Sequence, residues 1–173
     1  MSDVENPLSA PSGSALPVPS LYDWLGGTEV LEKLMVTFYE RVSADELLRP
    51  LLGDMPPDHP RHVADFVGEV TGGPDRYTAT RGGHATMLAH HFGRNISEEQ
   101  RRRWGNLLLD SAEEVGLPAD PEFRSALVAY LEWGSRLAVM NSQLPPGTVA
   151  DPATPMPKWG WGVPGGPYQP EEK

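Results

Sequence analysis

The chain has 173 residues, no cysteine and a formal net charge of −10. This length suits one domain with an ample core, and the lack of cysteine excludes disulfides, thiolate zinc sites, iron–sulfur clusters and thiol nucleophiles. The acidic balance argues against nucleic acid, no apolar run reaches the ~20 residues of a membrane span, and residues 1–20 lack a signal-peptide pattern. We therefore expect a cytoplasmic protein that binds neither nucleic acid nor membranes.

Proline marks the ends of the predicted domain. Four of the 19 prolines fall in residues 1–20 and eight in residues 143–173, which leaves seven for the 122 residues between them. Segments rich in proline, glycine and serine without hydrophobic periodicity are typical of extended or disordered chain. We predict a disordered N-terminal arm over 1–20, one domain over 21–142, and a tail rich in proline, glycine and tryptophan over 143–173.

The first half of the domain shows the three- and four-residue apolar spacing of helices. The predicted elements are a turn over Leu21–Leu25, a long helix capped by Thr28, a short helix over Asp45–Leu51, and a helix that begins near Pro60 and ends before Gly72. Proline in a first turn and glycine after a last turn are the usual helix boundaries. Residues 75–83 lack periodicity and are predicted to be irregular.

The second half continues the helical pattern. It predicts a helix over His84–His91 that Gly93 ends, a long helix opened by a capping box of Ser97 and Gln100, and a last helix capped by Asp120 with Pro121 in its first position. No segment alternates with period two over more than a few residues. The predicted fold class is therefore all-α.

The five histidines are the most informative polar residues: His59, His62, His84, His90 and His91. His59 and His62 could share a metal ion on one helix, although a pair of surface histidines fits equally well. Adjacent helical residues point about 100° apart. We expect His91 to lie on the apolar stripe and His90 to turn outward. The pattern leaves open whether His91 is a ligand or an ordinary core residue.

Other features give little support for catalysis. The sequence has no G-x-S-x-G, no glycine-rich phosphate loop and no H-E-x-x-H. The run Arg101–Arg103 and carboxylates such as Glu98-Glu99 are predicted to lie on solvated helix faces. Tyr39 and Trp104 lie on or beside apolar stripes, where aromatic residues are more often core than pocket.

Several motifs occur together in a fixed order: Tyr22-Asp23 before Gly26-Gly27, FYERV at 38–42, GGP at 72–74, RGGHATMLAHHFGRNIS at 81–97, and Trp104. With them, the segment from Tyr22 to about Ser142 resembles the group II truncated haemoglobins. In that family a histidine opens a short helix and the haem ligand follows seven residues later, which points to His91. The group II tryptophan comes thirteen residues after the ligand, where Trp104 stands.

The resemblance implies a truncated globin fold, with helices packed two over two around haem b. His91 would be the iron ligand, with its other ring nitrogen bonded to a backbone carbonyl. Tyr39 and Trp104 would donate hydrogen bonds to bound O₂ and slow its release.

The chain departs from the family pattern in part of the pocket. Leu52 stands thirteen residues after Tyr39, where an aromatic hydrogen-bond donor is frequent in the family. His90 replaces an arginine common before the ligand, so one contact to a haem propionate is expected to be weaker. Tyr77 and Arg81 are the expected propionate partners.

A further departure concerns the distal gate of the pocket. His59 or a neighbour falls at the gate position, with Val63 and Phe66 one and two turns further on. His59 or His62 could supply a third hydrogen bond or a sixth iron ligand. The alternative is that both histidines are exposed beside the proline-rich loop.

The resemblance implies a haem protein that binds O₂ and other diatomic gases at five-coordinate iron, as an oxygen carrier, store or sensor. One alternative is an NO dioxygenase or peroxidase-like enzyme, which would need a separate reductase or peroxide. Another is a helical binding module without haem. The segment PMPKWGWGVPGGPYQP at 155–170 is either a disordered tail or a segment whose aromatic residues pack on the domain or on a partner. No feature indicates the oligomeric state.

Overall fold

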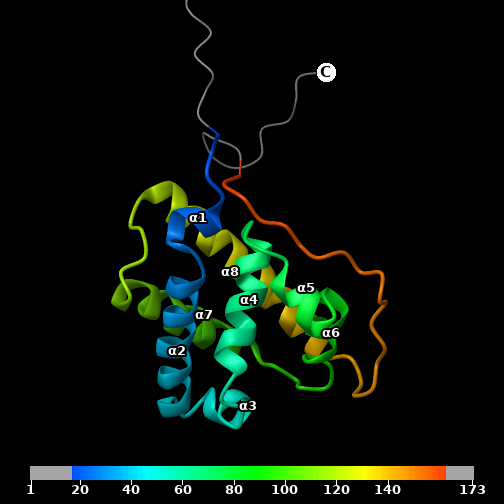
Figure 1. Ribbon diagram of the computed structural model, residues 1–173. Coiled ribbons are helices and arrows are strands. Elements are labelled where there is room, and N and C mark those ends of the chain that lie inside the picture. The colour runs from blue at the N-terminus through cyan, green and yellow to red at the C-terminus, as the bar shows by residue number, and fades with distance from the viewer. Residues whose placement is uncertain (1–16, 163–173) are drawn as a thin grey trace, which may run out of the picture.

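The computed structural model describes residues 17–162, and all regular secondary structure in that range is helical (Figure 1). The helices in chain order are α1 (Leu21–Leu25), α2 (Gly27–Ala44), α3 (Arg49–Leu52), α4 (His59–Val70), α5 (Arg76–Arg81), α6 (His84–Ala89), α7 (Glu98–Glu114) and α8 (Pro121–Ser142). The all-α prediction is confirmed. The predicted arm over residues 1–20 lies mostly outside the described residues, as does the end of the tail after residue 162.

The long helices form two packed pairs. Helix α2 packs against α4, α7 packs against α8, and contacts between α2 and α7 join the pairs. The apolar stripes meet in one core, whose fully buried large side chains include Phe38, Phe123 and Leu31. Burying such side chains contributes about 1.5–3 kcal/mol each. The short helices α5 and α6 lie beside α4 and α8, at the edge of the two pairs (Figure 1).

Two predicted helix starts are confirmed in detail. Ser97 Oγ accepts a hydrogen bond from the backbone N–H of Gln100 (3.0 Å), and Gln100 Oε1 accepts one from the N–H of Ser97 (3.0 Å). Asp120 Oδ1 accepts from the N–H of Phe123 (2.9 Å), with Pro121 in the first turn. Both caps pair backbone donors that a helix cannot pair internally, so they could be identified from the sequence alone.

Helix α2 begins differently from the prediction. Its N-cap is Gly26, which has a φ of 112° and no side chain to cap the helix. The predicted cap, Thr28, instead pairs its hydroxyl with the Tyr22 hydroxyl (2.6 Å) and accepts a hydrogen bond from the Arg76 guanidinium (3.1 Å). Thr28 therefore joins α1, α2 and α5 instead of capping α2.

The prediction that residues 75–83 are irregular is wrong, because α5 spans six of them. Tertiary contacts stabilise this short helix. The Glu69 carboxylate accepts hydrogen bonds from the backbone N–H (2.9 Å) and the hydroxyl of Thr78, and the Tyr77 side chain is only 3% exposed. A helix this short is marginal without such contacts.

The short helix predicted over Asp45–Leu51 also differs from its predicted bounds. The structure has a turn and then α3 from Arg49 to Leu52 in place of a helix over Asp45–Leu51. Asp45 Oδ1 accepts from the backbone N–H groups of Leu47 (3.1 Å) and Leu48 (3.0 Å), and this local bonding competes with a helix.

The prediction that Arg101–Arg103 lie on a solvated helix face is wrong for Arg101, because its side chain is only 8% exposed. Its guanidinium pairs with Glu98 (2.7 Å) on α7 and with Glu132 (2.9 Å) on α8. A buried cation needs such partners. Arg101 therefore ties the two helices of one pair together.

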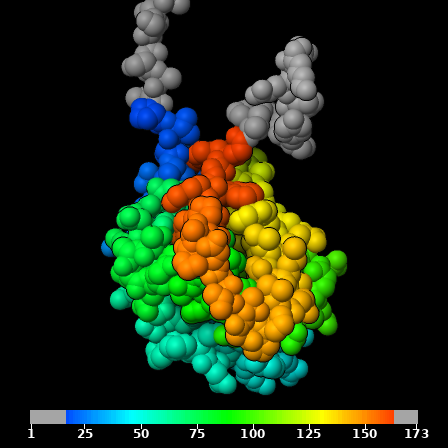
Figure 2. All heavy atoms as spheres, turned by 90° about the vertical axis from the view of Figure 1, so that its right-hand side faces the viewer, coloured from blue at the N-terminus to red at the C-terminus, as the bar shows by residue number. Residues whose placement is uncertain are grey.

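Residues 143–162 run back over the domain after α8 (Figures 1 and 2). Near their start, the backbone N–H of Gly93 donates to the carbonyl of Leu144 (2.8 Å); near their end, the N–H of Trp159 donates to the carbonyl of Val70 (2.8 Å). The described part of the 155–170 segment therefore packs on the domain, which is one of its two predicted alternatives. Within residues 17–162 no helix combines the length and apolar character that crossing a membrane requires.

Candidate functional site

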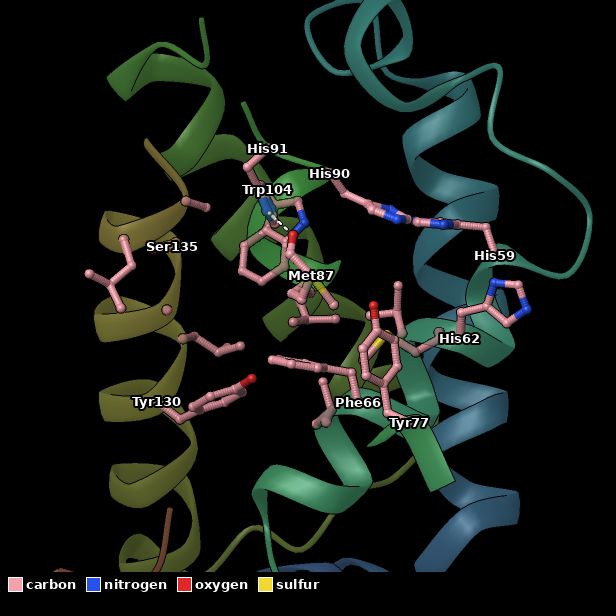
Figure 3. A pocket seen from close by; sticks show the side chains of 18 of the residues that line it. His59, His62, Phe66, Tyr77, Met87, His90, His91, Trp104, Tyr130 and Ser135 are labelled. Atoms are coloured by element: carbon pink, nitrogen blue, oxygen red, sulfur yellow. Dashed lines mark hydrogen bonds between the residues drawn. The ribbon is translucent and has the colours of Figure 1, made fainter. Parts of the chain in front are cut away.

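A cavity of about 550 Å³ lies between the helix pairs and the short helices. This volume is in the range of small-molecule and cofactor sites, ~300–1,000 Å³. Its walls are mainly apolar, and all ten predicted site residues line it: Tyr39, Leu52, His59, His62, Val63, Phe66, Tyr77, Arg81, His91 and Trp104. Figure 3 shows side chains from different helices around the same space.

His91 lies just beyond the end of α6 and is held by one local hydrogen bond. Its Nδ1–H donates to the carbonyl oxygen of Met87 at 2.9 Å (Figure 3). Burial lowers the pKa of His91, so the neutral ring is favoured. Because Nδ1 carries the proton, Nε2 keeps a free lone pair, as metal-binding histidines require. The backbone-carbonyl partner predicted for the ligand is therefore present.

His90 is exposed, as predicted, but it still lies beside the cavity. Helix α6 ends at Ala89, so His90 and His91 lie in a turn and not on one continuous helix. The His90 side chain is exposed, yet it lines the rim of the cavity and points toward His59 (Figure 3). The two histidines differ in burial and in the hydrogen bond to Met87, which His91 alone makes among the described residues.

Tyr39 on α2 and His59 at the start of α4 form a hydrogen-bonded pair across the cavity wall. The Tyr39 hydroxyl lies 2.9 Å from His59 Nε2, and the two rings meet edge to face with centroids 5.0 Å apart. Burial raises the pKa of the Tyr39 phenol. Burial, with the positive charges of nearby histidine and arginine groups, lowers the pKa of His59 to about 4. Both partners are therefore neutral near pH 7.

His62 belongs to a polar cluster at the cavity rim. Its Nε2 lies 3.0 Å from the Asp58 carboxylate and contacts the Arg81 guanidinium. Arg81 also lies 3.8 Å from the same carboxylate. The structure thus places His62 and Arg81 together, with the His62 Nε2 already paired. Tyr77, which lies on α5 with Arg81, is buried against Phe66 with ring centroids 5.1 Å apart.

Trp104 on α7 presents a free donor. Its ring packs edge to face on Phe38, with centroids 5.7 Å apart, and its indole N–H has no acceptor within residues 17–162. Leu52 and Val63 add apolar wall, as expected from their side chains. A donor without a partner in an apolar cavity is available to a bound molecule.

The structure adds cavity residues that sequence reasoning missed. Arg94 lines the rim, and its guanidinium donates to the carbonyl of Leu51 at 3.3 Å. Tyr130 on α8 lines the interior and is only 7% exposed. Its hydroxyl has no hydrogen-bond partner among the described residues, and burial raises its pKa. Tyr130 lies on the apolar stripe of α8, so the sequence suggested only a core position.

The available side chains fit a metal ion that is already held in an organic chelate and needs only one protein ligand. Residues 17–162 contain no group of three or more histidine, cysteine, aspartate or glutamate side chains arranged for a metal ion. One neutral histidine, a large apolar cavity and a basic rim instead suit a flat, hydrophobic chelate with acidic substituents. The residues therefore fit haem.

Comparisons with known proteins agree with this geometry. Residues 20–133 match the family model described as bacterial-like globin. The group 2 truncated hemoglobin YjbI of Bacillus subtilis (strain 168) is 32% identical over 117 residues, which cover 68% of this chain and 86% of that protein.

Two solved structures are also similar. The truncated oxygen-avid haemoglobin from Bacillus subtilis has a TM-score of 0.62 at 31% identity, covering 70% of this chain and 99% of that one. The thermostable hemoglobin from Thermobifida fusca has a TM-score of 0.62 at 30% identity, covering 70% and 97%. The chain belongs to the bacterial-like globin family, as a group II truncated haemoglobin with haem iron as its cofactor.

Proposed function

We propose that this globin binds O₂ and other diatomic gases reversibly, as an oxygen carrier, store or sensor, with His91 as the iron ligand. The observation that carries the proposal is the hydrogen bond from His91 Nδ1 to the Met87 carbonyl at the wall of a cavity of about 550 Å³. This bond fixes the ring and leaves Nε2 as the one nitrogen that can bind metal. Haem supplies the gas-binding iron.

Two donors are available to a gas molecule in the cavity. The Trp104 indole N–H has no acceptor within residues 17–162. The Tyr39 hydroxyl oxygen can accept from His59 Nε2–H, which leaves its own proton for a ligand. Hydrogen bonds to a ligand that carries negative charge would contribute about 1.5–3 kcal/mol each. Tyr39 and Trp104 therefore slow O₂ release. The similar structure of an oxygen-avid haemoglobin from Bacillus subtilis supports O₂ as the ligand.

His59 acts through Tyr39 and not as a competing iron ligand. Its Nε2 is 2.9 Å from the Tyr39 hydroxyl, so binding metal through that atom would break the pair. The His62 Nε2 is likewise engaged by Asp58 and Arg81. We therefore expect the ferrous protein without gas to be five-coordinate.

The basic rim accommodates the acidic side of the cofactor. Arg81 and the buried Tyr77 are the proposed propionate partners, and the position of Arg94 at the same rim adds a further candidate. Arginine suits carboxylates because its planar fork can donate two parallel hydrogen bonds.

The test is a haemin titration of the purified apoprotein. We expect one haemin per chain, a Soret band, a five-coordinate ferrous spectrum, and an O₂ complex that returns to the ferrous form when O₂ is removed. A protein that stays colourless with added haemin would refute the proposal. Rapid turnover of O₂ with NO, or of peroxide, would favour an enzyme over a carrier.

A further inference from the structure

The last described part of the chain, residues 154–162, forms a C-terminal strap over the cavity. In Figure 2 it crosses the surface between the residues of α5 and those of α8. Pro157, within the strap, lines the cavity, and Met156 and Trp159 pack against the core. The strap is therefore part of the cavity wall.

The strap lies outside the part of the chain that matches the globin family, which ends at residue 133. The relatives from Bacillus subtilis and Thermobifida fusca are covered over 86–99% of their own length by only 68–70% of this chain. Family membership therefore does not explain what this segment does, and its role has to come from its contacts.

Trp159 joins α4 to α8 with two hydrogen bonds. Its backbone N–H donates to the carbonyl of Val70, the last residue of α4, at 2.8 Å. Its indole N–H donates to the carbonyl of Ala126, in α8, at 3.1 Å. Carbonyls at a helix C-terminus have no partner inside the helix, so Val70 gains the bond that its own helix cannot give. One residue thus fixes the spacing of two cavity walls.

The Trp159 ring also packs on two aromatic residues that line the cavity. Its centroid is 5.9 Å from that of Tyr130 and 5.5 Å from that of Trp133. Four residues earlier, the carbonyl of Pro155 accepts a hydrogen bond from His84 Nδ1 (3.1 Å), and His84 lines the cavity beside Phe66. The strap therefore supports cavity residues on both α6 and α8.

We propose that Trp159 is a positioning residue for the haem cavity and slows loss of the cofactor. It links α4 to α8 and packs against Tyr130. This inference rests on the proposed function, because it needs haem in the cavity. Tyr130 is the group through which Trp159 acts, with its unpartnered hydroxyl at the surface that the cofactor would contact.

The experiment measures the rate of haem transfer from the full-length haem-loaded protein to excess apomyoglobin, followed at the Soret band. Trp159→Ala removes the ring and its hydrogen bond, and we expect haem loss about tenfold faster, equivalent to about 1.4 kcal/mol. Trp159→Phe keeps an aromatic ring against Tyr130 and should restore most of the parent rate. This rescue separates positioning from a general loss of stability.

Trp161→Ala is the matched control. Trp161 lies two residues further along, and its indole N–H donates to the carbonyl of Pro19 (2.7 Å), away from Tyr130. We expect haem loss within about twofold of the parent. Haem loss that is unchanged in Trp159→Ala, or increased equally in both alanine variants, would overturn the inference.

A second measurement covers the case in which Trp159→Ala does not fold. Tyr130→Phe and Trp159→Phe change single groups, and the ferric absorption and resonance Raman spectra should shift in Tyr130→Phe but not in Trp161→Ala. Identical ferric spectra in Tyr130→Phe, Trp159→Phe and Trp161→Ala would count against a contact between Tyr130 and the cofactor. If the parent itself took up no haemin, the proposed function would fail, a result distinct from any difference between the variants.

Discussion

The two sides of the cavity are built in different ways. His91 is oriented by a bond to Met87, four residues earlier in the same segment. The Tyr39–His59 pair joins residues 20 positions apart on two helices. A local bond survives small shifts of the helices, whereas a pair between helices depends on how α2 packs against α4. If His91 is the iron ligand as proposed, its mutation should abolish haem binding, whereas mutations in the Tyr39–His59 pair should change O₂ release in graded steps.

The largest effect is expected at His91. His91→Ala removes the nitrogen proposed to bind iron, and should abolish stoichiometric haemin binding or give a scrambled spectrum, measured by titration at the Soret band. His90→Ala is the matched control, and should leave the five-coordinate ferrous spectrum intact because His90 lies at the exposed rim. Equal losses in both variants would show that His91 is not distinguished from its neighbour.

Tyr39→Phe should have the next largest effect. It removes one of the two proposed donors to O₂, and we expect the O₂ dissociation rate to rise by about tenfold, equivalent to about 1.4 kcal/mol. Stopped-flow displacement of O₂ by CO measures this rate. Tyr22→Phe removes a hydroxyl that pairs with Thr28 and does not line the cavity, and should leave the rate nearly unchanged. An unaltered rate in Tyr39→Phe would assign O₂ retention to Trp104 or His59.

A smaller change is expected from His59→Ala. The variant keeps the Tyr39 hydroxyl but removes the partner that lies 2.9 Å from it. One neutral hydrogen bond contributes about 0.5–1.5 kcal/mol, so the O₂ dissociation rate should change only a few-fold. The same stopped-flow experiment applies, with His62→Ala as the control. A ferrous spectrum that is six-coordinate in the parent and five-coordinate in His59→Ala would contradict the assignment of His59 to Tyr39.

The smallest effect concerns pH and stability. Burial lowers the pKa of His59 to about 4 in the folded chain, against about 6.5 when unfolded. Between pH 6.5 and 4 the unfolded chain binds a proton at His59 that the folded chain does not bind. The free energy of unfolding is therefore at its full value above pH 6.5 and decreases as the pH falls from 6.5 toward 4. The melting temperature of the apoprotein should fall between pH 7.5 and 5, and should fall less in His59→Gln.

Ion pairs made by carboxylates should contribute little to the loss of stability between pH 7.5 and 5. The hydrogen bond from Arg101 lowers the pKa of Glu98 to about 2, so that pair keeps its charge down to pH 5. Circular dichroism at several pH values measures the melting temperature, with Val149→Ala as a surface control because this side chain is 87% exposed. Equal pH dependence in the parent and His59→Gln would rule out His59 as a source of the loss.

Most of the helical architecture follows from local rules in the sequence. The capping box at Ser97 and the Asp120 cap use residues three positions apart, and apolar spacing identified the long helices. The His91 bond to Met87 spans four residues, so it too could be expected once the family resemblance had singled out His91. In each case the atoms involved are close in the chain, and the residue types alone specify the contact.

Only the tertiary structure decided the rest. Helix α5 depends on Glu69 from a different helix, and Arg101 is buried because Glu132 on α8 pairs with it. Tyr39 meets His59 through the packing of α2 on α4, and Trp159 reaches Val70 and Ala126 across long stretches of chain. Periodicity shows which face of a helix is buried, but not which residues of another element lie against that face. The sequence alone therefore determined most of the helices and pointed to His91 as the proposed iron ligand, whereas the Tyr39–His59 pair and the strap depend on how the helices pack together.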